Sequence, residues 1–385
     1  GKRQAIVSSS DCSDAALDEL VERAVAMARV VPEDQFCGLA DSEQLANDIP
    51  DVDECDPVEP SATVLEARAH DAEAAARDVP GVTNSEGAEA GWSRSRVAIA
   101  ASNGFAKVRV RSSHSISAAV LAGEGTGMER DYDWASVVHG EDLPDSAEIG
   151  RKAGENAVKR LNPKKISSAQ VPVIYDPRVA QSILTHLAGA VNGAAIARGT
   201  SFLKDRMDTS VFSDAITIVD DPLRPRGLRS KAFDGEGLAT SRKNIIEDGT
   251  LTTWILDLRS ARQLGLKSTA NAARGTSSPP SPATTNLYME PGSVSPAELI
   301  ADIKSGLYIT GLMGQGANLI TGDYSRGAEG FWIENGEIAY PVSELTIAGN
   351  LDTMFRSVIP ANDLIFRFGT NAPTLRIDGM TVAGK

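Results

Sequence analysis

The chain has 385 residues and a formal net charge of −14, from 38 Lys and Arg against 52 Asp and Glu, and this length favours two or three domains with a sizeable core. The acidic balance argues against a nucleic-acid partner, because binding to phosphate needs a basic patch. No apolar run approaches the roughly 20 residues that cross a bilayer, and we see no signal peptide, so we expect no action at a membrane.

The three cysteines, Cys12, Cys37 and Cys55, all lie near the start of the chain. An odd number confined to one region is untypical of a disulfide framework and favours a reduced protein. We therefore expect the cytoplasm as its location.

At the start of the chain, Gly1-Lys2-Arg3 predicts a turn, and residues 4–8 predict the second strand of a hairpin whose first strand is missing. We expect a truncated beginning that leaves a sheet edge unpaired. Residues 13–30 then predict an amphipathic helix, because apolar residues recur at helical spacing and Pro32 closes the segment.

A second helix is predicted before Pro80, with Thr63 and Glu66 as its capping box. From Trp92 the apolar residues alternate with a period of two, which is typical of strands with one solvent-facing side. Strands are predicted over residues 106–120, after an Asn103-Gly104 turn, and over residues 128–134.

Lys107, Arg109 and Arg111 form a row of cations along the first of these strands. The row can be interpreted as a nucleic-acid contact or as the solvated face of a strand. The second interpretation is favoured, because charged side chains on a strand most often face water.

A helix is predicted from Asp145 to Leu161, and Asn162-Pro163 after it marks a candidate domain boundary. We therefore expect an N-terminal domain over residues 1–162 and a C-terminal domain over residues 163–385.

In the second half, a strand is predicted over residues 171–175 and a long helix over residues 177–197, with Asp176 as its N-cap. Gly189 and Gly193 on that helix would allow another element to approach closely. Further predicted elements are a strand ending before Asp220, a hairpin with an Asp248-Gly249 turn, helices over residues 256–264 and from Ser295 to Gly306, and closing strands over residues 363–368 and 374–382.

These elements predict an α+β fold. The N-terminal domain should consist of helices on an antiparallel sheet, and the C-terminal domain of twisted, barrel-like β-sheet with helices. A doubly wound sheet is disfavoured because regular βαβ alternation is absent.

The stretch from Thr310 to Asn350 is rich in glycine, and it predicts backbone at positive φ or packed closely against another segment. Asn335-Gly336 between apolar runs predicts a hairpin with a type I′ turn. The polar side chains of the stretch gather at Gln315 and at Asp323-Tyr324-Ser325-Arg326.

The segments LMGQG, ITGDYSRGA, GFWIENGEI, YPVSE and TIAGN of this stretch, with LGLKST from Leu264 and the FDGEG turn from Phe233, resemble the TldD/PmbA family, also called modulator of DNA gyrase. The resemblance is to the PmbA (TldE) branch, and it is strongest from Val171 onward. It implies a cytoplasmic zinc metallopeptidase of two components that degrades peptides or unfolded segments. The acidic charge gives the gyrase name no support.

In the TldD branch, the resemblance places an H-E-x-x-x-H zinc motif on the helix predicted here over residues 177–197. This chain has His186 alone there, and no carboxylate between Gln181 and Arg198. A late cysteine ligand is also expected in that branch, but the place near Phe368-Gly369-Thr370-Asn371 holds none. We expect no catalytic, cofactor-binding or metal-binding residue in this chain, and zinc in the partner subunit.

Three functions remain open: a non-catalytic subunit of a TldD–TldE-type zinc peptidase, an autonomous hydrolase with an unrecognised site, and a scaffolding or binding protein. The first makes a TldD-like zinc subunit the partner, with a homodimer when the chain is isolated. A peptide substrate could then be held by strand addition, and Gly189 and Gly193 would lie near the partner's zinc helix.

The residues we expect to contact the partner or peptide are Asp323, Tyr324, Ser325, Arg326, Gln315 and His186. The alternative for residues 323–326 is a polar hairpin loop in which Asp323 and Arg326 form a local ion pair. In the functional interpretation, Arg326 holds a backbone carbonyl or a carboxylate.

Overall fold

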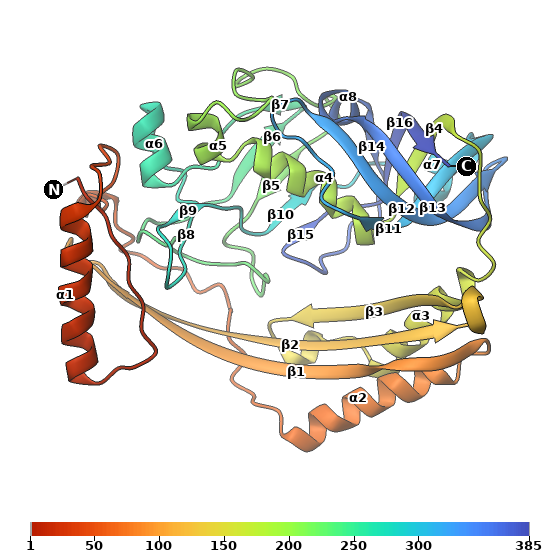
Figure 1. The fold of residues 1–385 in the computed structure, drawn as a ribbon, viewed down its shortest axis with the longest axis horizontal. Helices are drawn as coiled ribbons and strands as arrows, with labels where there is room; N and C mark the ends of the chain where they lie inside the picture. Colours follow the sequence, from red (N-terminus) through yellow and green to blue (C-terminus); the bar gives the residue numbers. More distant parts are fainter. Residues whose placement is uncertain (1, 385) are drawn as a thin grey trace.

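The structure is a computed structural model that describes residues 2–384, so Gly1 lies outside the described residues. It has two layers that face each other (Figure 1): a curved β-ribbon backed by helices, and a larger body of β-sheet and helices. No helix within residues 2–384 is both long and apolar enough to cross a bilayer.

The ribbon layer is a three-stranded antiparallel sheet in the order β1-β2-β3, with two helices against one face. Alternate side chains of β2, such as Ile116 and Val120, are buried against Ile149 and Ala153 of α3. Its elements are α2 (Ala62–Arg77), β1 (Val82–Ala100), β2 (Ala106–Ala122), β3 (Glu129–Val137) and α3 (Ser146–Lys159).

The larger body contains a closed barrel of five strands in the order β13-β12-β11-β4-β16, because β13 also pairs with β16. Its interior belongs to the largest hydrophobic core of the chain. The strands are β4 (Ala169–Tyr175), β11 (Ser305–Met313), β12 (Asp323–Glu334), β13 (Glu337–Asn350) and β16 (Leu375–Ala383), with β14 (Val358–Pro360) paired to β16.

Beside the barrel lies a second sheet in the order β15-β10-β5-β6-β7, which continues the same core. It comprises β5 (Ile218–Asp220), β6 (Lys243–Glu247), β7 (Thr250–Leu251), β10 (Leu287–Met289) and β15 (Thr370–Asn371), and a short pair, β8 (Ala272–Ala273) with β9 (Ser281–Pro282), lies nearby. The helices of the body are α4 (Pro177–Ala190), α5 (Gly193–Ala197), α6 (Leu258–Leu264), α7 (Pro296–Ala301) and α8 (Leu351–Ser357).

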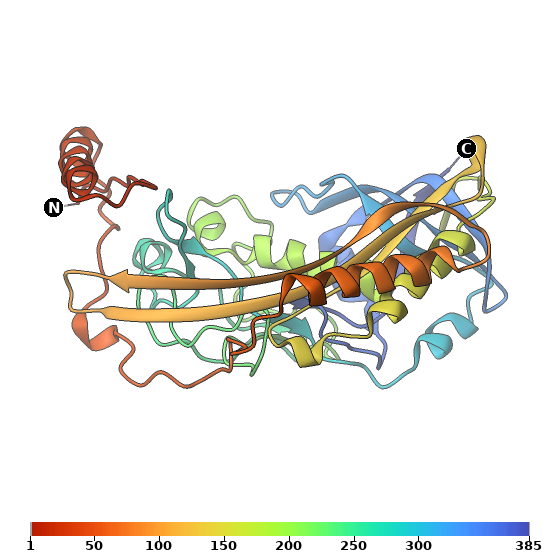
Figure 2. The same ribbon diagram turned by 90° about the horizontal axis from the view of Figure 1, so that it is seen from below.

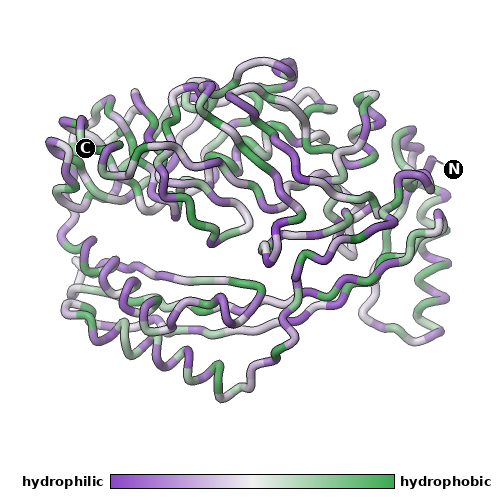
Figure 3. Tube along the Cα trace, turned by 180° about the vertical axis from the view of Figure 1, so that it is seen from behind, coloured by the Kyte–Doolittle hydropathy of each residue, from purple (hydrophilic) through white to green (hydrophobic). Residues whose placement is uncertain are grey.

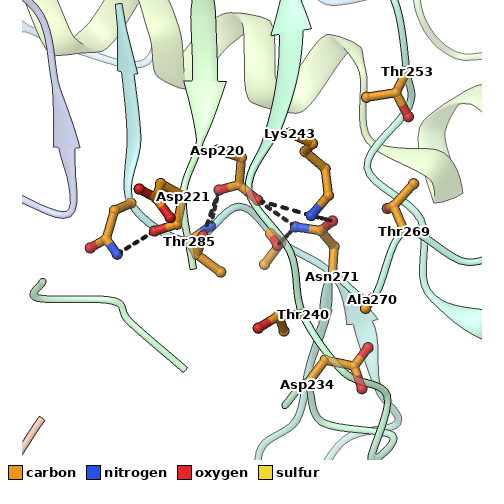
Figure 4. A network of polar contacts seen from close by, with 12 residues as sticks. Asp220, Asp221, Asp234, Thr240, Lys243, Thr253, Thr269, Ala270, Asn271 and Thr285 are labelled. Atoms are coloured by element: carbon orange, nitrogen blue, oxygen red, sulfur yellow. Dashed lines mark hydrogen bonds and ion pairs between the residues drawn. The ribbon is translucent and has the colours of Figure 1, made fainter. Parts of the chain in front are cut away.

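A buried carboxylate ties the loops of this second sheet together (Figure 4). Asp220 accepts hydrogen bonds from the Thr285 amide (2.6 Å) and the Asn271 side chain (2.8 Å), and Lys243 lies 3.8 Å away. Because every part of this charge has a partner, we assign the network to stability rather than to chemistry.

The predicted α+β fold is confirmed, with helices on an antiparallel sheet in the N-terminal half and a barrel with helices in the C-terminal half. Both predicted hairpin turns are present. Asn335 and Gly336 have φ of 51° and 83°, and Asp248 and Gly249 have φ of 45° and 75°, as a type I′ turn requires. The three cysteines are unpaired.

Two predicted strands are absent from the described residues. Residues 4–8 have no ladder partner, and one backbone bond, from the Asp34 amide to the Lys2 carbonyl, holds this segment instead. Residues 363–368 curl back because the Asn371 side chain accepts hydrogen bonds from the Arg367 and Phe368 amides, both at 2.9 Å, and such local bonds compete with strand pairing.

Several helix and strand limits also differ from the predictions. The helix over residues 177–197 is divided, because the Asn192 side chain caps α5 with a bond from the Ala194 amide (3.0 Å). The N-cap of α2 is Ser61 rather than Thr63, α7 ends at Ala301 rather than at Gly306, and β1 begins at Val82, ten residues before Trp92.

The cation row on β2 is not a solvated face, so that interpretation was wrong. Figure 2 shows β1 and β2 continuing beyond α2 and α3. Arg109 and Arg111 of the row line a cavity together with Lys231 and Asp234 of the larger body. Arg109 pairs with Glu54 and donates to the Ser230 carbonyl (2.7 Å), while Val108 on the other face is 49% exposed.

The predicted N-terminal helix, α1 (Asp14–Val30), is present but buries none of its residues. Hydrophobic residues recur along it in Figure 3, and Leu17, Val21 and Val25 of its apolar face are exposed. Three-residue 3₁₀ helices occupy Ser42–Gln44, Gly125–Gly127 and Gly140–Asp142.

Candidate functional site

A cavity of about 460 Å³ lies where α4, β11 and β12 of the larger body face β3 of the ribbon layer. The N-terminus of α4 is held by Asp176, which accepts hydrogen bonds from the Arg178 amide (2.9 Å) and the Tyr308 hydroxyl (2.7 Å). The apolar side of α4 is buried in the barrel core, and its other side presents Ser182, Thr185 and His186 to the cavity.

The start of β12 brings Arg326 into the same cavity. Side chains of a strand alternate between its two faces, so Tyr324 and Arg326 point inward and Asp323 and Ser325 are exposed. The proposed hairpin loop with an Asp323–Arg326 ion pair is therefore wrong, because the segment is a strand and the two residues lie on opposite faces. Asp323 accepts instead from the Thr321 hydroxyl (2.7 Å).

His186 packs edge-on against the Tyr324 ring, with the ring centroids 5.6 Å apart. Burial, reinforced by the charge of Arg326, lowers the pKa of His186 to about 4, so the imidazole is neutral near pH 7. Burial also raises the pKa of Tyr324, whose hydroxyl lies 3.5 Å from that of Tyr175.

Four buried polar atoms around this cavity lack a hydrogen-bond partner within the described residues: Ser182 Oγ, His186 Nε2, Thr310 Oγ1 and Arg326 Nε. They make up half of the eight such atoms found in residues 2–384. Because an unpaired buried polar group costs about 1–3 kcal/mol, this concentration marks the cavity as the candidate functional site.

Ion pairs between the two layers frame the cavity. Arg160, at the end of α3, donates two hydrogen bonds of 2.5 Å to Glu329 of β12, and Arg178 of α4 donates at 2.7 Å to Asp131 of β3. Burial alone would lower the pKa of Arg178, but the Asp131 carboxylate outweighs it, and the pKa is raised.

Arg326 differs from these framing arginines, because no carboxylate within residues 2–384 lies within 4.0 Å of its guanidinium. Arg130, another arginine of the lining, pairs with Glu86 at 2.6 Å. The cavity therefore has one cation whose charge is not balanced by a direct neighbour.

Of the six residues expected to contact partner or peptide, the structure brings His186, Gln315 and Arg326 together in the cavity lining. The Tyr324 ring packs against His186, and Asp323 and Ser325 lie outside the cavity lining. Ser182 was not among the predicted residues, although helical spacing relates it to His186. Thr310 and the framing ion pairs were not predicted either, because only the tertiary fold brings them to the cavity.

Gly189 and Gly193 are filled by this chain's own residues rather than left open for another protein. A Cβ at Gly189 would lie 2.7 Å from Leu319 Cδ1, and one at Gly193 would lie 2.8 Å from the Ile255 carbonyl oxygen. The close packing at both glycines was predicted correctly. The space that was expected for the partner's helix is occupied by Leu319 and Ile255 of this chain.

The residues present do not fit a zinc ion. Zinc sites in hydrolases combine three His, Asp, Glu or Cys ligands, and α4 offers His186 beside the neutral hydroxyls of Ser182 and Thr185. A guanidinium faces that imidazole and would repel a dication. No cluster of three or more His, Cys, Asp or Glu side chains suited to a metal occurs among residues 2–384.

The sequence matches the models of two metallopeptidase domains. Residues 168–384 match the model of the PmbA/TldA metallopeptidase C-terminal domain, and residues 49–161 match that of the PmbA/TldA metallopeptidase central domain. The chain therefore belongs to the PmbA/TldD family, as its sequence motifs predict.

Two curated relatives are similar along the whole chain. It is 38% identical over 387 residues to Metalloprotease PmbA of Escherichia coli O157:H7, covering 100% of this chain and 84% of that protein. It is 34% identical over 389 residues to the Metalloprotease PmbA homolog of Haemophilus influenzae, with the same coverage of both chains.

Two solved structures share the fold. A putative modulator of DNA gyrase from Bacteroides thetaiotaomicron superposes with a TM-score of 0.91 at 28% identity, covering 100% of this chain and 86% of that one. TldE from Thermococcus kodakarensis superposes with a TM-score of 0.87 at 22% identity, covering 100% and 88%, which shows the common fold.

Proposed function

We propose that this chain is the non-catalytic subunit of a TldD/TldE-type zinc metallopeptidase complex that degrades peptides or unfolded segments in the cytoplasm. The proposal is supported by membership of a metallopeptidase family together with the residues that α4 presents to its cavity. In this role the chain binds and positions substrate, and its TldD-like partner supplies the zinc.

The observation that carries the proposal is that His186 and Arg326 lie in the same cavity lining. A hydrolytic zinc site needs several anionic or imidazole ligands and a general base. Here the imidazole faces a cation, and the neighbouring side chains on α4 are hydroxyls. Such a cavity is suited to holding an anionic or polar group, not to activating water.

Metal content separates this proposal from an autonomous hydrolase. The purified chain, compared with a purified TldD-like subunit, should contain no stoichiometric zinc and should not cleave unfolded casein or short peptides. Stoichiometric zinc in the isolated chain, with cleavage that disappears in His186→Ala, would contradict the proposal and establish a second catalytic chain.

A further inference from the structure

We propose that the cavity between α4 and β3 is a receptor for the C-terminal carboxylate of a peptide, held by Arg326, Ser182, Thr310 and His186. This inference rests on the proposed function, because it takes the bound molecule to be the substrate of the peptidase pair. It adds the chemical feature by which that substrate is recognised.

The charge of the cavity favours an anion. Arg160 and Arg178 are neutralised by Glu329 and Asp131, whereas the Arg326 guanidinium has no carboxylate within 4.0 Å in the described part of the chain. A bound carboxylate would give Arg326 the ion-pair partner that it lacks. Arginine suits the task because its planar fork matches the two oxygens of a carboxylate.

The unpartnered atoms also match a carboxylate in number and kind. Two carboxylate oxygens offer about four acceptor sites. The cavity presents Arg326 Nε, the hydroxyls of Ser182 and Thr310, and His186 Nε2, all buried and without a partner within residues 2–384. Neutral His186 donates from Nε2 when that nitrogen carries its proton, so each of the four groups is a possible donor to a carboxylate oxygen.

The neighbouring sheet edge favours recognition of a chain end over strand addition. β3 lies at the edge of its sheet, but its Tyr132 and Trp134 carbonyls already accept hydrogen bonds from Arg178 (3.2 Å) and Arg367 (2.6 Å). β11 and β12 are closed into the barrel. A peptide in this cavity would therefore find few free backbone groups of β3, β11 or β12 with which to pair as a strand. Its terminal carboxylate then provides the main interaction with the cavity.

Binding to the isolated chain tests the inference without any partner. We would titrate acetyl-trialanine with a free carboxylate, and the same peptide with a C-terminal amide, by isothermal titration calorimetry. The free acid should bind at least about tenfold more tightly, because hydrogen bonds to charged groups are the stronger ones. Equal affinity of the wild-type chain for both peptides would overturn the proposal.

Variants assign the effect to Arg326. Arg326→Ala, and Arg326→Gln as a second variant closer in size, should bind the acid and the amide equally. Arg242→Ala is the matched control and should keep the preference for the acid, since Arg242 lies outside the cavity lining, is about half exposed and is paired with Glu290. Retained preference for the acid in both Arg326 variants, with native circular dichroism, would contradict the assignment.

Two further measurements complete the test. The first distinguishes a peptide carboxylate from other anions, and the second distinguishes this inference from the proposed function. Acetate and inorganic phosphate should compete with the peptide only at far higher concentration, and phosphate binding as tightly as the free acid would point to a phosphate site instead. In the assembled pair, Arg326→Ala should raise KM with kcat preserved. A chain that binds the acid but forms no peptidase pair would defeat the proposed function and leave this site standing.

Discussion

Burial keeps the His186 imidazole neutral, and the nearby charge of Arg326 reinforces this effect. Together they lower the pKa of His186 to about 4. A pair of this kind keeps the cavity cationic through the guanidinium alone, with a neutral hydrogen-bonding ring beside it. The receptor that we propose would therefore keep the same charge across neutral pH.

The lowered pKa of His186 predicts an acid-dependent loss of stability. Unfolding releases the ring to water, where it takes up a proton below pH 6.5, whereas the folded ring stays neutral to about pH 4. The free energy of unfolding should therefore fall as the pH drops through this window.

Replacing His186 should remove part of that loss. His186→Gln should lose about 1–2 kcal/mol less stability than the wild type between pH 7 and pH 4.5 in urea unfolding, a figure discounted for solvent screening. His70→Gln, at an exposed position on α2, is the control. Identical pH profiles for His186→Gln and the wild type would refute this assignment.

A second titratable group, the partly buried Glu236, has the opposite pH dependence. Burial raises the pKa of Glu236 to about 7, although the carboxylate accepts a hydrogen bond from the Leu258 amide (2.8 Å). The folded chain keeps a proton between pH 4.5 and pH 7 that the unfolded chain releases, so this group makes stability fall as the pH rises through that window.

Glu236→Gln should therefore be more stable than the wild type by about 2 kcal/mol at pH 8, and equal to it at pH 4.5. The amide oxygen can still accept from Leu258. Glu337→Gln on β13, which is exposed, should show no such difference. Thermal unfolding at the two pH values measures the effect, and a variant no more stable than the wild type at pH 8 would contradict it.

Residue roles in the cavity were predictable only in part from sequence. The spacing of Ser182 and His186 on a helix places them on one side, and strand alternation would have placed Arg326 beside Tyr324 had the segment been identified as a strand. Thr310 and Asp131 come from distant parts of the chain, so no local pattern relates them to His186.

At the scale of elements, the loop between β11 and β12 is held by a glycine that leaves no space for a side chain. A Cβ at Gly316 would lie 1.4 Å from the Ser325 carbonyl oxygen. The Ser325 amide also donates to the Gly316 carbonyl (2.7 Å). This contact fixes Gln315 beside the cavity.

Gly316→Ala should therefore destabilise the chain by about 3 kcal/mol, because the backbone must move apart. Gly127→Ala is the matched control, since no atom lies within 4 Å of its Cβ position and its φ is not in the left-handed region. Urea unfolding would measure both. Similar midpoints for the two variants would show that the loop adapts without cost.

Elements with a strong local signal were predicted well. Asn335-Gly336 and Asp248-Gly249 demand positive φ, which few other dipeptides tolerate. Capped helices such as α3 and α4 were also located correctly. Residues 363–368 were mistaken for a strand because the Asn371 side chain, not a strand pattern, decides their backbone path.

At the scale of the whole molecule, the ribbon layer and the larger body each have a hydrophobic core, and a small cluster that includes Phe105 and Phe233 lies between them. We propose on this basis that residues 1–162 and 163–385 are distinct domains. Arg160 joins them through Glu329, with Glu129 and Asp131 within 3.5 Å, and its side chain is only 13% exposed. The walls of the candidate cavity depend on this junction.

Arg160→Met should cost about 3 kcal/mol of stability, because it leaves buried carboxylates unpaired. Combining it with Glu329→Gln should cost less than the sum of the two single changes, which a double-mutant cycle in urea measures. Lys152→Met on α3, at an exposed pair with Glu148, should change stability by no more than about 0.5 kcal/mol. Additive effects of Arg160→Met and Glu329→Gln would contradict the coupling.

The central claim, that this chain is the non-catalytic half of a peptidase, is tested most directly by reconstitution. The chain and a TldD-like zinc subunit would be purified separately, mixed, passed over a gel-filtration column, and assayed for peptide cleavage alone and together. Our account predicts a stable complex and cleavage that exceeds that of the zinc subunit alone. No complex, with cleavage by the zinc subunit unchanged on adding this chain, would contradict it.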